Sequence, residues 1–129
     1  MNSNRLNVFV AGLLVAGLAL AATPVLAHHA GVMFSSDQVN ELTGTIKEVQ
    51  WTNPHIWIQV NVEGTDGVTR EWSVEWGSPN SLGRRGIRPS SFPVGDTVEM
   101  RVRPMIDGTE AGAFVGAMFA NGDTVGRWE

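Results

Sequence analysis

Three histidines are the residues best suited to chemistry in this chain of 129 residues. His28 and His29 are adjacent, and His55 ends the run Asn53-Pro54-His55. If processing makes His28 the first residue, its α-amine and imidazole can chelate a metal in one ring, and His55 can add a second imidazole. Such a planar nitrogen set, a histidine brace, suits Cu(II). Cu(II) is therefore the candidate cofactor, with His29 as the alternative third ligand.

The same histidines also have a structural interpretation. A chain terminus stays mobile unless something ties it down, so His28 and His29 would be solvated and His55 would only stabilise the turn at Pro54. No nucleophile elbow, phosphate-binding glycine loop or H-E-x-x-H motif occurs in the sequence. We therefore expect a protein that is not an enzyme, with or without a metal.

The strand that follows Pro54 offers a second candidate site. Polar and apolar residues alternate from position 55 to 62, a period typical of a half-buried strand. The loop at residues 63–67 ends in Asp-Gly and predicts a hairpin. Closing this hairpin by pairing Val62 with Val68 predicts three opposite pairs on the outer face: His55 with Glu75, Trp57 with Ser73, and Gln59 with Glu71.

This outer face suggests ligand binding. Trp57 could stack on a sugar or another flat ligand, with Gln59 and Glu75 beside it, and Glu75 could orient His55 toward a metal. The alternative is that Met33 and Phe34 cover Trp57, since an exposed tryptophan is unfavourable on a small domain unless it is used. The copper site also requires residues 32–34 to lie across this face, because only then does His28 approach His55.

The first 27 residues predict a signal peptide. Arg5 precedes an apolar run at residues 8–20, and Val25-Leu26-Ala27 places small residues at the cleavage positions. The run is shorter than the ~20 residues needed to span a bilayer. We expect cleavage after Ala27, an exported protein without membrane attachment, an N-terminal extension at residues 28–40 and a folded domain at 41–129.

Composition excludes several classes of protein. The formal charge is −4, and nucleic-acid binding needs a basic stripe that the short cluster Arg84, Arg85 and Arg88 does not provide. Cysteine is absent, which excludes disulfides, thiol catalysis, iron–sulfur clusters and thiolate zinc sites. The core must therefore rely on packing, and we expect Trp51, Trp72 and Trp76 to be part of it.

The pattern of residues 41–129 predicts an all-β domain with one short helix. The first strand, at 41–51, carries a bend at Gly44 and a bulge near Glu48. Further strands are expected at 55–62, 68–76, 97–104 and 111–120, with one or two helical turns at 78–86 and a tail from 124. This order is that of a small five-stranded OB-like barrel with its helix after the third strand. An open β-sandwich is the alternative.

Several short motifs together resemble the DUF6152 family of small exported bacterial proteins. They are His28-His29, Gly44-Thr45-Ile46, Asn53-Pro54-His55-Ile56-Trp57, Trp72-Ser73-Val74-Glu75, Ser78-Pro79-Asn80, Arg84-Arg85-Gly86, Gly95-Asp96 and Asp107-Gly108. Ala30 departs from the serine that the family often has there. The resemblance implies a periplasmic protein of a Gram-negative bacterium with a β-barrel-like fold and no established activity. Its partner would be a small ligand or a periplasmic protein.

Overall fold

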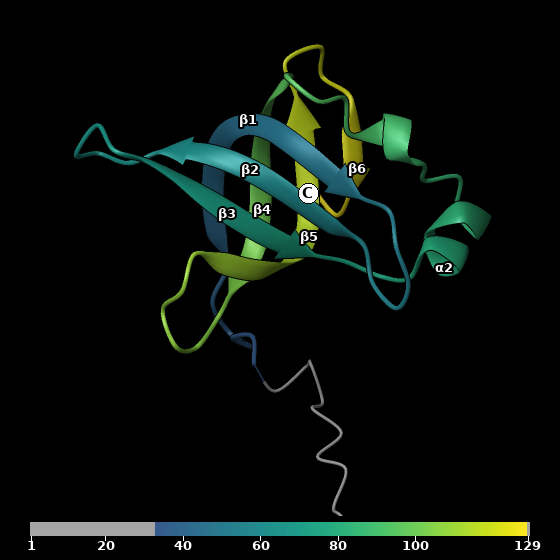
Figure 1. Cartoon of the computed structure of the whole chain (residues 1–129), viewed down its shortest axis with the longest axis horizontal. Coiled ribbons are helices and arrows are strands. Elements are labelled where there is room, and N and C mark those ends of the chain that lie inside the picture. Colours follow the sequence, from purple (N-terminus) through teal and green to yellow (C-terminus); the bar gives the residue numbers. More distant parts are fainter. Residues whose placement is uncertain (1–32, 129) are drawn as a thin grey trace, which may run out of the picture.

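Alternating apolar residues fold the chain into a small β-barrel in the computed structural model, which describes residues 33–128 (Figure 1). The strands are β1 (Asn40–Gln50), β2 (Trp57–Glu63), β3 (Thr69–Glu75), β4 (Thr97–Pro104), β5 (Ala111–Phe119) and β6 (Thr124–Gly126). The predicted signal peptide, His28 and His29 lie outside the described residues. Within residues 33–128, no helix has the length and apolar character needed to cross a membrane.

The barrel closes with the strand order of an OB fold. Neighbours in the order β3-β2-β1-β4-β5 are antiparallel, and β3 closes the sheet by pairing in parallel with β5, with Ser73 opposite Ala111. The alternative of an open β-sandwich is therefore wrong. The residues from 124 were expected only as a tail, and no strand was assigned to them. β6 nevertheless pairs with β5, because the turn at Asn121–Asp123 reverses the chain onto its neighbour.

β1 bends so that one strand pairs on both sides. Gly44 lies opposite Val62 of β2 and opposite Val98 of β4. A Cβ atom on Gly44 would lie 2.4 Å from the backbone oxygen of Asn61, so the close approach of β1 and β2 requires glycine here. The register with β2 shifts between Ile46 and Glu48, which confirms the predicted bulge.

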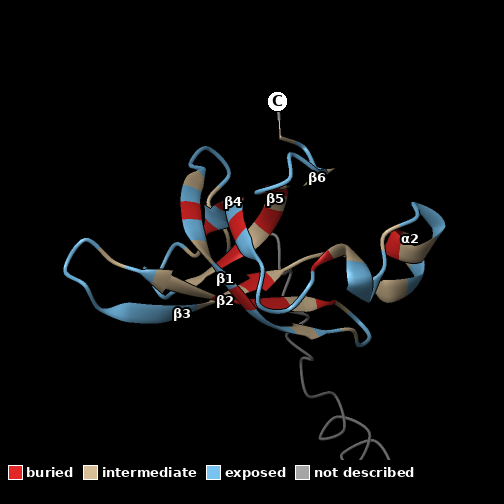
Figure 2. Ribbon diagram, turned by 90° about the horizontal axis from the view of Figure 1, so that it is seen from above, coloured by how far each residue is buried: buried red, intermediate tan, exposed pale blue. Residues whose placement is uncertain are grey.

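The core fills the barrel with the inward-facing residues of all five strands (Figure 2). Trp51, Trp72 and Trp76 pack against it and are partly buried, as expected. Trp76 and the buried Phe92 meet edge to face at 6.2 Å between ring centroids. These aromatic contacts close the barrel at the end that carries the helix.

The connection from β3 to β4 contains the predicted helix, α2 (Pro79–Arg84). Ser78 caps it by accepting a hydrogen bond from the backbone N–H of Ser81 at 3.3 Å, and Leu82 anchors it in the core. A 3₁₀ turn, η2 (Pro89–Ser91), follows. Proline at its first position favours such a turn.

Candidate functional site

The outer face of β2 and β3 gathers the side chains that the sequence singled out, but in a different register. Trp57 lies opposite Glu75, Gln59 opposite Ser73, and Asn61 opposite Glu71. The predicted pairs His55–Glu75, Trp57–Ser73 and Gln59–Glu71 are thus wrong as directly opposite residues. Because the slip is two residues, each side chain stays on its predicted face.

The hairpin loop explains the slip. Val68 was assigned to the strand, but its carbonyl accepts the N–H of Gly64 at 2.9 Å, and Gly67 donates to the carbonyl of Gly64 at 2.9 Å. The Asp66 carboxylate also accepts the N–H of Val68 at 3.1 Å. Val68 therefore belongs to the loop, and the first pair of the ladder is Glu63 with Thr69.

His55 nevertheless contacts Glu75. It lies just before β2, where Ile56 exchanges backbone hydrogen bonds with Trp76 and Gly77 at 3.1 Å, so the chain runs alongside β3 before the regular ladder begins. Nδ1 of His55 pairs with Oε1 of Glu75; the His55 side chain is 41% exposed and that of Glu75 is 12% exposed. The carboxylate holds one ring nitrogen and leaves Nε2 as the atom available to a ligand.

The centre of this face is more buried than the sequence suggested. Gln59 is only 7% exposed, and its side-chain oxygen accepts a hydrogen bond of 2.7 Å from the hydroxyl of Ser73. Trp57 is half-buried beside them. The face thus combines one partly accessible aromatic ring with fixed hydrogen-bonding groups, an arrangement that can bind a flat polar molecule.

The segment before β1 does not dock as predicted. Met33 and Phe34 were expected over Trp57, but Phe34 pairs with Met105, and the N–H of Ile106 donates to the carbonyl of Met33 at 3.0 Å. The loop between β4 and β5 attracts this segment because it extends the edge of β4 that β1 already uses. The position of Val32, the remaining candidate, lies outside the described residues.

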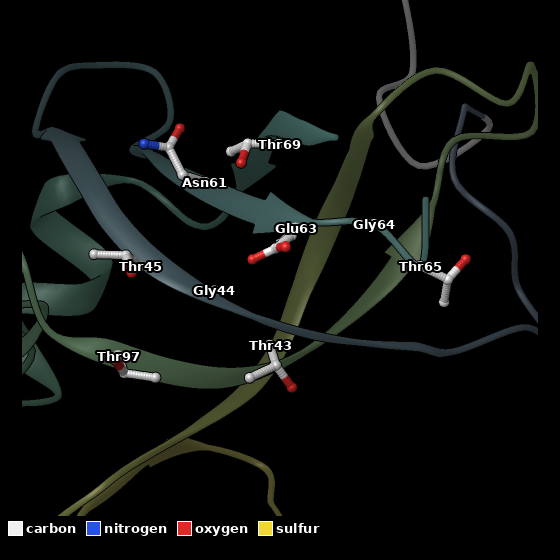
Figure 3. Close-up of a pocket in the computed structure, with 9 residues that line it drawn as sticks. All are labelled: Thr43, Gly44, Thr45, Asn61, Glu63, Gly64, Thr65, Thr69 and Thr97. Carbon is white, nitrogen blue, oxygen red and sulfur yellow. The ribbon is translucent and has the colours of Figure 1, made fainter. Parts of the chain in front are cut away.

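A groove that the sequence analysis missed lies at the bend of β1. It measures about 710 Å³ and is lined by Thr43, Gly44, Thr45, Asn61, Glu63, Gly64, Thr65, Thr69 and Thr97. Figure 3 shows Thr43 and Thr97 on one side of it and Asn61 and Thr69 on the other. In the sequence, the groove is indicated only by Thr43 and Thr45, which flank Gly44 and point outward. Threonines are common in strands, so this pattern does not predict a groove.

Electrostatics near the groove come from the hairpin. The guanidinium of Arg70 donates to Asp66 at 2.6 Å, and this contact, aided by the N–H of Val68, holds the pKa of the Asp66 carboxyl well below its usual range. Glu63 brings a further carboxylate to the groove wall. Glu63 is the one carboxylate among the lining residues, and a single carboxylate among hydroxyl groups does not form a pair for general acid–base catalysis.

Metal binding by the described residues alone has no support. Between positions 33 and 128, no three His, Cys, Asp or Glu side chains come together as a group able to hold a metal ion. His28 and His29, the other predicted ligands, precede this part of the chain. Only His55, with Glu75 behind it, is in place as a candidate ligand.

Comparison with known proteins places the chain in a family. No curated protein and no solved structure matches it. The family model described as "Family of unknown function (DUF6152)" matches residues 15–114, which include the helix and most of the barrel. The chain therefore belongs to the DUF6152 family.

Proposed function

We propose that the protein is a non-catalytic binding module of the periplasm, exported by a signal peptide that is cleaved after Ala27. Its ligand, a small flat molecule or an exposed group of a periplasmic protein, would bind on the outer face of β2 and β3. The observation that carries the proposal is the half-buried Trp57, directly opposite Glu75 and next to the Gln59–Ser73 hydrogen bond.

The physical argument is preorganisation. Gln59 and Ser73 already bond to each other, and the Glu75 carboxylate already pairs with His55, so little side-chain freedom remains to be lost on binding. The ring of Trp57 supplies apolar area that prefers a flat partner over water. The face formed by the second and third strands is also where OB barrels commonly bind oligosaccharides and oligonucleotides. The charge of −4 disfavours the nucleotide polymers.

Substitution of Trp57 tests this proposal. Methyl β-glucoside and p-nitrophenol serve as probes, one for sugars and one for planar aromatics, with binding followed by calorimetry. We expect Trp57→Ala to weaken binding of the accepted probe about tenfold, the loss of one stacking contact. Trp128→Ala is the matched control, because Trp128 is also half-buried but packs on Arg101 of β4. Equal losses in both variants would contradict the proposal, as would binding of neither probe.

A second candidate function is copper binding, and the His55–Glu75 pair favours it. A carboxylate on one ring nitrogen is the usual companion of a metal-bound histidine on the other. The remaining ligands would be the α-amine and imidazole of His28, with His29 as the alternative, completing a histidine-brace-like Cu(II) site. The docking of Met33 and Phe34 on the loop after β4 counts against this site, because the copper arrangement was expected to require them across the β2–β3 face, and only residues 28–32 remain to reach His55.

A Cu(II) titration followed by spin resonance separates the two functions. If copper binds, protein that begins at His28 should give a nitrogen-rich Cu(II) spectrum, and one extra residue before His28 should abolish it by displacing the α-amine. If the protein instead binds a ligand on the outer face of β2 and β3, the extra residue should not change the binding of methyl β-glucoside or p-nitrophenol. An unchanged copper spectrum after His55→Ala would exclude this second candidate.

A further inference from the structure

Charge is distributed unevenly along the chain. Residues 76–95, the connection between β3 and β4 without its last residue, Asp96, contain Arg84, Arg85 and Arg88 but no aspartate or glutamate. They hold three of the nine Lys and Arg residues and none of the thirteen Asp and Glu residues of a chain whose formal charge is −4. One segment is therefore purely basic on an acidic protein.

These three arginines are exposed and are not neutralised by the described part of the chain. Lys47, Arg70 and Arg101 each pair with a carboxylate, but no ion pair among residues 33–128 includes an arginine of this segment. The positive potential of the segment therefore reaches solvent.

The segment is also firmly held. Leu82 and Phe92 are each 1% exposed and anchor it at both ends in the core. Between them, the N–H of Ile87 donates to the carbonyl of Leu82 at 3.0 Å and closes the helix end. The guanidinium of Arg85 lies over the ring of Trp76, 5.5 Å from its centroid. The arginines therefore project from a rigid platform.

The basic segment lies at one end of the molecule. Figures 1 and 2 both place α2 at one end and the tip of the β2–β3 hairpin at the other. Near this tip, Asp66 pairs with Arg70 and Glu71 pairs with Lys47. The exposed and unpaired positive charge of the described chain is therefore concentrated at the α2 end, and a negatively charged surface would orient the protein with α2 foremost.

We propose that the segment at residues 76–95 is a docking face for an anionic membrane surface. The three arginines occupy the last residue of α2, its C-cap and the residue before η2, so their charge is spread along the backbone. A spread of charge suits a layer of lipid phosphates better than one bound anion. Val94 of the same segment is 65% exposed and offers an apolar side chain to the headgroup region.

Vesicle co-sedimentation tests the proposal on protein recovered from cells that express the whole gene, so that natural processing is retained. The vesicles contain equal parts of phosphatidylglycerol and phosphatidylcholine, or phosphatidylcholine alone. We expect binding only to the anionic vesicles, with a steep loss as salt increases. Each arginine near such a surface contributes roughly fivefold, so R84Q/R88Q should weaken binding by about thirtyfold.

The matched control is R103Q/R127Q, which removes the same charge from two arginines that also lack an ion pair in the described chain but lie outside the basic segment. It should retain most of the binding, and both variants should melt like the wild type. Three results would overturn the proposal: no binding to anionic vesicles at low salt, equal losses in the two variants, or competition by inorganic phosphate beyond its ionic strength, which would indicate a single-anion site.

Discussion

The outer face of β2–β3 and the groove at the bend of β1 meet at Asn61 but differ in character. The face holds a partly accessible tryptophan and two pairs of polar side chains already in contact. The groove offers about 710 Å³ but is lined mainly by threonines and glycines. The groove therefore offers the space, whereas the face offers the side chains best suited to binding a ligand.

The origin of the two regions accounts for the difference. The groove exists because β1 bends at Gly44 and leaves β2 to follow β4, so it is a consequence of closing the barrel. Nothing in the closure of the barrel requires a tryptophan, a histidine and a buried glutamine to share one outer face. We infer that the groove has a structural origin and that the face is the binding surface.

The largest effect should come from the groove wall. Gly44→Ala would place a Cβ atom 2.4 Å from a backbone oxygen that cannot move without breaking the ladder, and we expect a loss of about 1–3 kcal/mol in the free energy of unfolding. Gly83→Ala is the control, since nothing lies within 4 Å of that position, and alanine should stabilise α2 by up to about 1 kcal/mol. Urea denaturation measures both. A neutral Gly44→Ala would show that the bend is not fixed by packing.

A smaller effect is expected on the face. Glu75→Gln removes the charge that faces His55 from a largely buried position, and we expect a loss of about 1 kcal/mol in unfolding free energy at neutral pH. Glu71 lies on the same strand as Glu75 and forms an exposed ion pair with Lys47 of β1. Glu71→Gln breaks that pair and should change the unfolding free energy less. If the two substitutions have the same effect, the His55–Glu75 pair is not a preorganised part of the face.

The smallest effect concerns pH at the hairpin beside the groove. Arg70 and the N–H of Val68 lower the pKa of Asp66, so the folded loop favours the ionised carboxylate. The stabilisation is complete above the usual aspartate pKa of about 4 and is lost only as pH falls through the lower pKa of the folded state. The Val68 amide resonance should therefore titrate in strong acid in the wild type and not in Asp66→Asn. Titration at the usual aspartate pKa would contradict this account.

Much of the fold could be predicted because local patterns and closure rules agree. The period-two alternation, the short helix after the third strand and the bulge in β1 follow from residue types alone. The predicted hairpin register was wrong because valine favours strands, and Val68 was therefore assigned to one. The Asp66 carboxylate instead accepts the N–H of Val68 and holds this residue in the loop. The composition of the face survived this error, since a slip of two residues leaves every side chain on its side.

The groove and the docking of Met33 could not be predicted in the same way. Both depend on how far β1 and β2 diverge and on which strand edge remains free, and these are properties of the closed barrel. Outward threonines and short apolar segments are compatible with many tertiary arrangements. The sequence therefore identified the chemical groups of the candidate site but not the surfaces around them.

The most direct test of the central claim is an amide and indole NMR map of the protein during titration with p-nitrophenol and methyl β-glucoside. We expect shifts concentrated on the Trp57 indole N–H, the Gln59 side-chain amide and the backbone of Ser73, with the groove residues Thr43 and Thr97 unchanged. Shifts centred on the groove, or scattered evenly over the barrel, would contradict the assignment of the β2–β3 face as the binding surface.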